Sequence, residues 1–118
     1  MRPEVNLDPA VTNADKYKVV FENERVRVLE YTDQPGESTT LHGHPDSVMY
    51  TLSSFRRRLV NGETSRDVEL PAGAVNWLPA QQHLGENIGD TTTHVLFVEL
   101  KGNVDDTAET LGLGPSTP

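Results

Sequence analysis

The sequence predicts an all-β fold, a small antiparallel β-barrel with no substantial helix, and three observations point to it. The chain has 118 residues, which is the size of one domain. From residue 17 onward, short runs rich in Val, Leu, Tyr, Phe and Thr alternate with turn residues at intervals of roughly ten, as in all-β proteins. No stretch carries a convincing helical pattern of apolar residues.

Eight runs are predicted to form the strands, and turn residues separate them. Asn61-Gly62 predicts a two-residue hairpin, because both residue types tolerate the positive φ that such a turn requires. Pro and Gly at residues 34–36 and 71–73 mark further reversals. Trp77 and Phe97, each among apolar neighbours, are predicted to pack in the core. The runs span residues 17–22, 25–33, 39–44, 47–52, 55–60, 65–70, 74–83 (74–78 and its continuation) and 92–101.

The two ends differ in composition from the middle of the chain. Prolines and scattered polar residues predict an N-terminal arm over residues 1–16, and Gly, Pro, Thr and Asp predict a flexible C-terminal tail over residues 102–118. The barrel domain then spans residues 17–101. One helical turn at residues 107–111 would be stopped by the glycines that follow it.

Charge and composition exclude several classes of function. A net charge of −8 argues against a nucleic-acid partner or an anionic membrane. The sequence shows neither a signal peptide nor an apolar run long enough to span a bilayer, so we expect a cytoplasmic protein. With no cysteine, disulfides, thiolate metal sites and cysteine nucleophiles are excluded, and any metal must be held by nitrogen and oxygen.

Three of the four histidines have the spacing of metal ligands. His42 and His44 are two residues apart, so on a strand both side chains project from one face and can reach one ion. His83, from another strand, would complete a set of three nitrogens that leaves positions open for water, oxygen or a substrate. Taken alone, His-x-His equally fits two exposed or hydrogen-bonded histidines near a turn.

The residues around these histidines resemble the two motifs of the cupin superfamily. Residues 36–44 match the first half of the first motif, a Gly followed by five residues and His-x-His. Residues 73–79 match the opening of the second motif, Gly, five residues and Pro, and residues 83–87 match its close, His, three residues and Asn. The resemblance runs from about Gly36 to Asn87 and implies a jelly-roll barrel.

The chain departs from these motifs at two places. The metal-binding Glu of the first motif would fall at Val48 or Met49, which cannot bind a hard cation, so the usual carboxylate ligand is missing. In the second motif Gln81 stands where Gly is usual, and His83 comes one residue early. Three neutral imidazoles would leave the full charge on a divalent ion and make it a stronger Lewis acid.

The resemblance implies one divalent transition metal held by His42, His44 and His83. Cupins with three-histidine sites include thiol dioxygenases and diketone-cleaving dioxygenases, which bind iron(II), and others that are isomerases or have no known activity. Fe²⁺ is therefore the favoured cofactor. Ni²⁺, Zn²⁺, Mn²⁺ and Cu²⁺ remain alternatives, because imidazole suits several of these ions.

Two neighbours are candidate catalytic residues. Strand alternation carried on from His44 places Tyr50 on the inner face, where its phenol would donate to a bound substrate, although a core tyrosine fits the same position. Gln81, two residues before His83, is predicted to point inward and to contact substrate or a water near the metal.

His94 and the Arg56-Arg57-Arg58 cluster have open roles. His94 fits a structural residue, a general base or a fourth ligand, and it is left out of the metal set. Alternation on a strand places Arg57 on the opposite face from Arg56 and Arg58. The cluster fits a solvated or subunit-facing strand, or one inward arginine that clamps the carboxylate of a small acid substrate.

The leading functional hypothesis is a mononuclear non-haem metal enzyme, dioxygenase-like or isomerase-like, that acts on a small polar organic molecule. One alternative is a non-catalytic cupin that binds a metabolite or a metal. Another is a barrel that binds no metal and only dimerises. A homodimer is expected in each case, because an open small barrel exposes strand edges and similar small cupins are commonly dimers.

Overall fold

The computed structural model describes residues 6–102, and nearly all of its regular structure is β. Every pairing between these strands is antiparallel, which confirms the predicted fold class. The elements are α1 Pro9–Thr12, β1 Tyr17–Glu22, β2 Val26–Asp33, β3 His42–His44, β4 Ser47–Thr51, β5 Phe55–Asn61, β6 Thr64–Leu70, β7 Val75–Leu78, β8 Gln81–Asn87 and β9 Thr93–Leu100.

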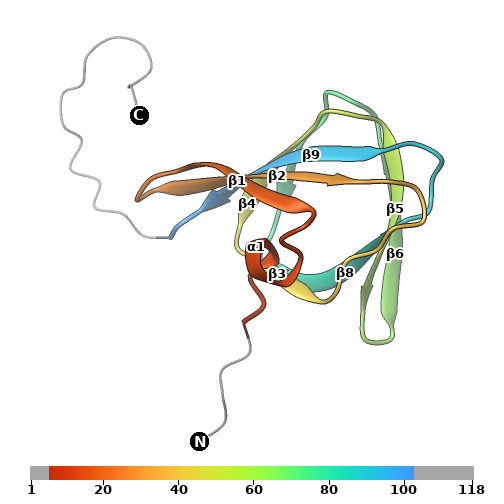
Figure 1. The fold of residues 1–118 in the computed structure, drawn as a ribbon, viewed down its shortest axis with the longest axis horizontal. Helices are drawn as coiled ribbons and strands as arrows, with labels where there is room; N and C mark the ends of the chain where they lie inside the picture. Colours follow the sequence, from red (N-terminus) through yellow and green to blue (C-terminus); the bar gives the residue numbers. More distant parts are fainter. Residues whose placement is uncertain (1–5, 103–118) are drawn as a thin grey trace, which may run out of the picture.

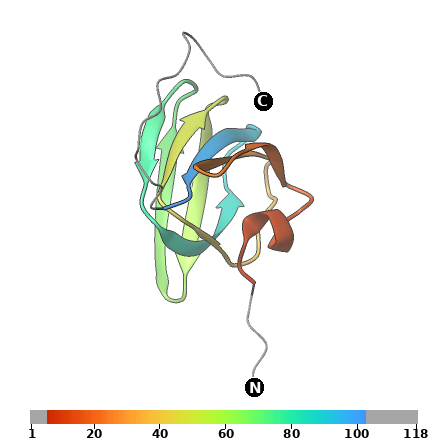
Figure 2. The same ribbon diagram turned by 90° about the vertical axis from the view of Figure 1, so that its left-hand side faces the viewer.

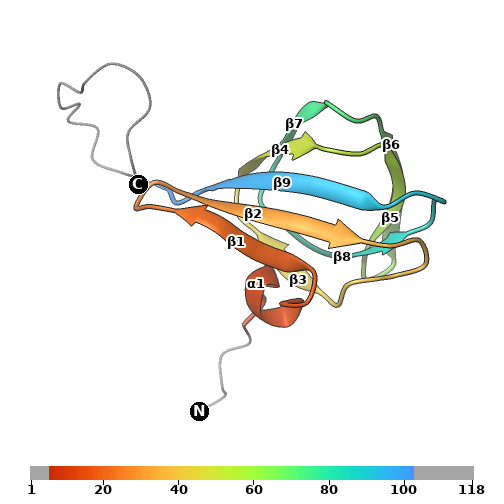
Figure 3. The ribbon, with the colours of Figure 1, turned by 45° about the horizontal axis from the view of Figure 1, so that its top comes forward.

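The strands form two sheets that face each other (Figures 1 and 2). One sheet has the order β1-β2-β9-β4-β7, and Figure 3 shows these strands side by side. The other has the order β3-β8-β5-β6. The chain crosses from one sheet to the other at every connection except β1–β2 and β5–β6. The predicted barrel is therefore a two-sheet sandwich, consistent with a jelly roll.

Several strand boundaries differ from the sequence prediction, and the run predicted over residues 39–44 is a strand only at His42–His44. The run predicted over residues 74–83 is two strands, β7 and β8, which belong to different sheets. Pro79 lies between them, and a proline has no N–H to donate to a continuing strand pair. In the β5–β6 hairpin Asn61 pairs with Thr64, so the loop is Gly62 and Glu63, one residue later than predicted. Gly62 supplies the positive φ of that turn, 60°.

The described part of the N-terminal arm packs against β1 and β3 (Figures 1 and 2). Asp8 caps helix α1 by accepting a hydrogen bond from the Ala10 N–H, and Pro9 occupies its first turn. The Gly43 N–H donates to the Leu7 carbonyl at 2.7 Å, which fixes the arm beside β3. No helix among residues 6–102 is long and apolar enough to cross a bilayer.

Residues 1–5 and 103–118 lie outside the described residues. The helical turn predicted at residues 107–111 falls in that range, and so does nearly all of the predicted tail.

The apolar core is small and lies between the two sheets. Leu29 is fully buried, and Phe97 is buried as predicted. Trp77, on the edge strand β7, is 55% exposed, so its predicted core position is wrong. The buried apolar residues are Tyr17, Leu29, Tyr31, Phe55, Val95 and Phe97.

Replacing Leu29 by alanine should lower the free energy of unfolding by about 2–5 kcal/mol, because the truncated side chain leaves a cavity in a closely packed core. Urea denaturation measures the change. Val20→Ala, at a position 47% exposed, is the matched control and should cost less than about 0.5 kcal/mol. Equal losses in both variants would contradict this description of the core.

Candidate metal centre

The pairing of β3 with β8 brings the predicted ligands together. His42 is directly opposite His83, and His44 is directly opposite Gln81. Residues opposite each other in an antiparallel pair project from the same face of the sheet, and here that face is the interior. The three histidines are at most 8% exposed. The inward orientation predicted for Gln81 is confirmed, since it lines the same interior cavity as His83.

The three imidazoles form a compact cluster. One ring nitrogen from each of His42, His44 and His83 lies within 4.8 Å of the other two. The ring centroids are 4.8 Å apart for His42 and His44, and 5.0 Å and 5.1 Å from His83. Three nitrogens this close can share one metal ion. The predicted grouping is confirmed, and within the described residues no carboxylate joins it.

Two of the rings are held by their Nδ1 atoms. Nδ1 of His42 lies 2.8 Å from the Thr40 carbonyl oxygen, and Nδ1 of His83 lies 2.8 Å from Oε1 of Gln81. Both partners only accept hydrogen bonds, so each Nδ1 carries the proton and each Nε2 presents a lone pair. Gln81 is itself fixed, because its Nε2 donates to the Pro79 carbonyl at 2.9 Å. Gln81 therefore orients His83, and its predicted catalytic role stays a prediction.

The third ring, His44, provides the test of whether the site fits a metal. Both of its nitrogens are fully buried and have no hydrogen-bond partner among residues 6–102. Leaving a buried polar atom without a partner costs roughly 1–3 kcal/mol, so such atoms are rare in native structures. A metal ion at Nε2 would satisfy the lone pair that the protein leaves open. The donor set and this unpartnered ring both fit a bound transition metal ion.

A buried carboxylate lies directly behind His44. Oε2 of Glu99 is 3.9 Å from Nδ1 of His44 and also has no hydrogen-bond partner in the described chain. Its other oxygen accepts from Nε of Arg27 at 2.7 Å, and Arg27 makes a bidentate pair with Asp8 at 2.8 and 2.9 Å. Burial acts to raise the pKa of Glu99, but the neighbouring His44 and Arg27 outweigh it and lower that pKa. Glu99 is therefore ionised at neutral pH.

Sequence reasoning missed Glu99. The carboxylate of the cupin motif was expected at Val48 or Met49, whereas Glu99 comes from β9, where it pairs with Ser47. The available signal was the alternation in the last strand, since Val95, Phe97 and Glu99 share one face and all three are buried. A glutamate in a series of buried apolar residues indicates a charged group with an interior partner.

Burial keeps two of the candidate ligands in the form that binds metal. The pKa of His42 is lowered to about 4 and that of His83 to about 3, mainly because burial disfavours the charged ring. Nearby His44 and Arg57 contribute to both shifts, and for His42 the hydrogen bond to Thr40 partly opposes the shift. Both imidazoles are neutral at pH 7, as metal coordination requires.

A cavity of about 290 Å³ adjoins the histidines. His42 and His83 form part of its wall, and much of the remainder is apolar. Tyr17 also lines it, with its hydroxyl 3.3 Å from Nε2 of His42. Burial raises the pKa of Tyr17, so the phenol keeps its proton and can donate. Tyr17 was not among the predicted site residues, because it lies in β1, far from either motif.

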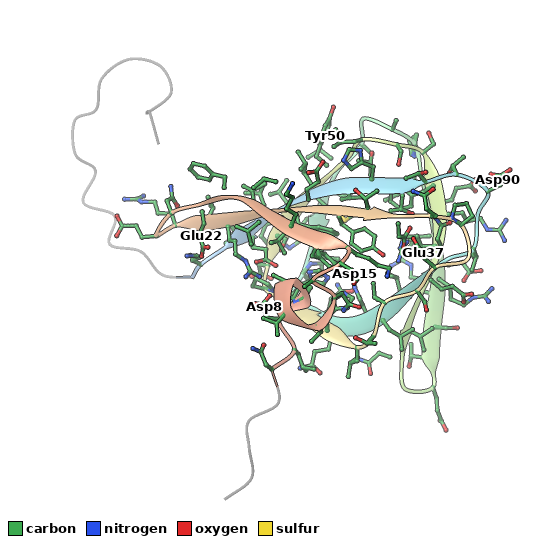
Figure 4. The ribbon with its side chains drawn as sticks, viewed as in Figure 1. Asp8, Asp15, Glu22, Glu37, Tyr50 and Asp90 are labelled. Atoms are coloured by element: carbon green, nitrogen blue, oxygen red, sulfur yellow. The ribbon has the colours of Figure 1, made fainter. Side chains whose placement is uncertain are left out.

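The predicted inward orientation of Tyr50 is wrong. Its side chain is 39% exposed and points out from the sandwich (Figure 4), and it does not line the cavity. Ser47 and Thr51 are buried instead, and Met49 lines the cavity. The chain changes sheets between His44 and Ser47, which are three residues apart and both buried. Inward-facing side chains therefore have even residue numbers in β3 and odd ones in β4, whereas the prediction had carried the even numbers on.

The structure also places His94 and the three arginines, whose roles the sequence left open. Nε2 of His94 is 2.6 Å from Oε2 of Glu30, and His94 is outside the ligand cluster. The alternation predicted for the arginines is confirmed: Arg56 and Arg58 are exposed, whereas Arg57 is 7% exposed and lines the cavity.

The metal-free protein should lose stability as the pH falls below about 6.5, the ordinary pKa of histidine. The unfolded chain binds protons on His42 and His83 at that pH, whereas the folded chain binds them only near pH 4 and pH 3. Each histidine should contribute a loss of roughly 1–2 kcal/mol between pH 7 and pH 5. Urea denaturation with a chelator measures it. His83→Gln should reduce the loss and Gln82→Ala, on the same strand, should not; equal pH slopes in all three proteins would contradict the assignment.

Glu99→Ala should weaken metal binding by about 10- to 100-fold, because a carboxylate 3.9 Å behind a ligand histidine raises the basicity of that ring. Competition with a fluorescent zinc indicator measures the affinity. Glu99→Gln, which keeps an acceptor but removes the charge, should fall between wild type and alanine. Glu30→Gln alters the other close Glu–His pair and is the matched control. Unchanged affinity in Glu99→Ala would exclude the role.

Comparison with known proteins places this arrangement in a family. No family model matches the chain, and no curated protein matches it in sequence. A cupin domain from Bordetella pertussis Tohama I is 30% identical, with a TM-score of 0.68 over 73% of this chain and 92% of that one. A double-stranded β-helix protein from Klebsiella pneumoniae is 24% identical (TM-score 0.59, 74% and 76% coverage). The polyketide cyclase RemF from Streptomyces resistomycificus is 21% identical (TM-score 0.56, 72% and 63% coverage). With its jelly-roll sheets and its three clustered histidines, this chain belongs to the cupin superfamily.

Proposed function

We propose that this cupin is a mononuclear metal enzyme in which His42, His44 and His83 hold one divalent transition metal ion. The observation that carries the proposal is the His44 ring, whose two buried nitrogens have no hydrogen-bond partner in the described chain although they lie within a set of three imidazoles. The adjoining cavity of about 290 Å³ is the place for a small organic substrate. Iron(II) is the favoured ion, as in the three-histidine dioxygenases that the motifs resemble.

A bound divalent ion would supply Lewis acidity to a substrate oxygen and, if it is redox-active, reactivity with dioxygen. The residues of the chain supply the rest. Thr40 and Gln81 hold the rings of His42 and His83 in place. Tyr17 has a protonated hydroxyl 3.3 Å from Nε2 of His42, and in this proposal it donates a hydrogen bond to a substrate oxygen.

In this proposal the apolar part of the cavity wall keeps water away from the reacting groups. Side chains such as Met49, Leu59 and Val68 line it, and they limit the access of water to the reacting end of the substrate. In such surroundings the charges of the site are less screened than in water. The apolar wall and the polar metal centre together fit a substrate with an apolar body and a polar end. The reaction is expected to be either dioxygenase-like or isomerase-like, as in the cupins that the motifs resemble. The expected homodimer stays a prediction.

Metal binding is tested first, with protein purified without a histidine tag. The metal-free chain is titrated with Co²⁺, whose visible absorption reports its coordination by nitrogen. We expect one equivalent to bind to wild type, a loss of at least about 100-fold in affinity in His44→Ala, and no change in His94→Ala, the matched control outside the cluster. Equal binding by wild type and His44→Ala would refute the three-histidine site.

The reaction class is tested by comparing metals. Fe²⁺-loaded and Zn²⁺-loaded protein are offered a panel of small carbonyl and hydroxy compounds, with oxygen consumption and product formation followed together. Substrate-dependent oxygen uptake with Fe²⁺ alone indicates a dioxygenase. Conversion without oxygen uptake with both metals indicates an isomerase. Tight binding of a compound with no conversion by either form would favour the non-catalytic alternative.

A further inference from the structure

A buried arginine shares the cavity with the histidines. Arg57 lies on β5 and is 7% exposed, and it lines the same cavity as His42 and His83. A guanidinium is always charged, so its burial needs partners for both its charge and its hydrogen-bond donors. The way in which those donors are used shows what remains for a ligand.

One end of the guanidinium is fully occupied by the protein. Nη1 donates to Oδ2 of Asp33 at 2.7 Å and to Oγ1 of Thr93 at 3.1 Å, and Nη2 donates to the Tyr31 hydroxyl at 3.1 Å. The Tyr31 hydroxyl itself donates to Asp33, so these two acceptors sit together at the Nη1–Nη2 end. Asp33 also accepts from Nδ2 of Asn87 at 3.1 Å. Three donors converge on Asp33, and its lone pairs are committed to the interior of the protein.

The other edge of the guanidinium has donors to spare. Of the five N–H groups of an arginine, the contacts with Asp33, Thr93 and Tyr31 use three, which leaves Nε–H and the second Nη2–H. Nε has no hydrogen-bond partner within residues 6–102, and it is not among the fully buried unpartnered atoms, so it keeps contact with the cavity. These two N–H groups are parallel, and such a pair fits the two oxygens of a carboxylate.

A glycine lets this edge of the guanidinium lie close against β8. A Cβ at Gly85 would lie 2.8 Å from Nη2 and 3.4 Å from Nε of Arg57, which is too close without a shift of the guanidinium. Gly85 follows His83 by two residues on the same face of β8, a spacing of roughly 7 Å along the strand. The free edge of Arg57 is therefore one side-chain position away from the metal centre, on the same cavity wall.

We propose that the substrate is a small organic carboxylate, bound at its carboxylate by the Nε–Nη2 edge of Arg57 and with its other end directed at the metal centre. This inference rests on the proposed function. The cavity of about 290 Å³ has the volume of about ten water molecules, which is room for a small organic ligand.

The test compares two probes of the same shape, benzoate and the uncharged benzamide, by ligand-observed NMR on metal-free and Zn²⁺-loaded protein. Benzoate should bind at least about 10-fold more tightly than benzamide in both forms, because only the carboxylate accepts two charge-assisted hydrogen bonds. Equal affinities for the two probes in both forms would overturn the proposal.

Variants locate the binding to Arg57. Gly85→Ala displaces the free edge but keeps the Arg57–Asp33 pair, and Arg57→Lys keeps the charge but removes the paired N–H groups. Each should weaken benzoate binding by at least about 10-fold, with little change for benzamide. Arg58→Gln, which alters an exposed arginine paired with Asp67, is the matched control and should change neither. Full benzoate affinity in folded Gly85→Ala protein would overturn the proposal.

The experiments can refute the metal centre and the carboxylate site independently of each other. If the metal-free protein prefers benzoate and this preference is lost in Gly85→Ala, the carboxylate site stands even where Co²⁺ shows no binding to the histidines. If Co²⁺ binds through His44 and neither form of the protein prefers benzoate, the metal centre stands and the carboxylate site does not.

Discussion

The register of β3 against β8 is the constraint on which the metal centre depends. It places His42 opposite His83 and His44 opposite Gln81, so three ligands and one orienting amide share a face. In a strand pair, a slip of one residue moves a whole set of side chains to the opposite face. Here a slip would turn Gly43 or Gln82 toward the interior in place of a ligand. The contact of the N-terminal arm with Gly43 adds a further hydrogen bond that holds β3 in this register.

The interior of this small protein is unusually polar for its size, and two buried charged networks connect its strands. Asp33 and Arg57 join β2 to β5, across the two sheets, and Asn87 of β8 joins the same network. Glu99 and Arg27 join β9 to β2, and Asp8 attaches helix α1 to them. Buried ion pairs contribute little net stability once desolvation is counted, because removing charges from water is costly. Their value here lies in positioning: each network ends at a group that faces the histidines or their cavity.

Sequence reasoning predicted the parts of the molecule that depend on local spacing. The strand runs, the inward orientation of Arg57 and the shared face of His42 and His44 all follow from the two-residue period within one strand. Tyr50 was misplaced because the chain changes sheets before β4, and no local pattern records that change of parity. Tyr17 was missed because it reaches the site through the packing of β1, which a single strand does not encode. The alternation of β9 indicated that Glu99 is buried, but its position beside His44 depends on the packing of β9.

The position of Glu99 affects whether a sequence motif can recognise such a metal site. A motif describes an order along the chain, whereas an ion and its ligands depend on neighbours in space. In this fold β4 and β9 are hydrogen-bonded partners, so a carboxylate lost from one of them can be supplied by the other at nearly the same depth in the interior. A pattern that requires the acid a few residues after the histidines would reject a chain that keeps a negative charge beside them. In this chain, the negative charge beside the histidines therefore comes from a strand more than fifty residues after the first motif.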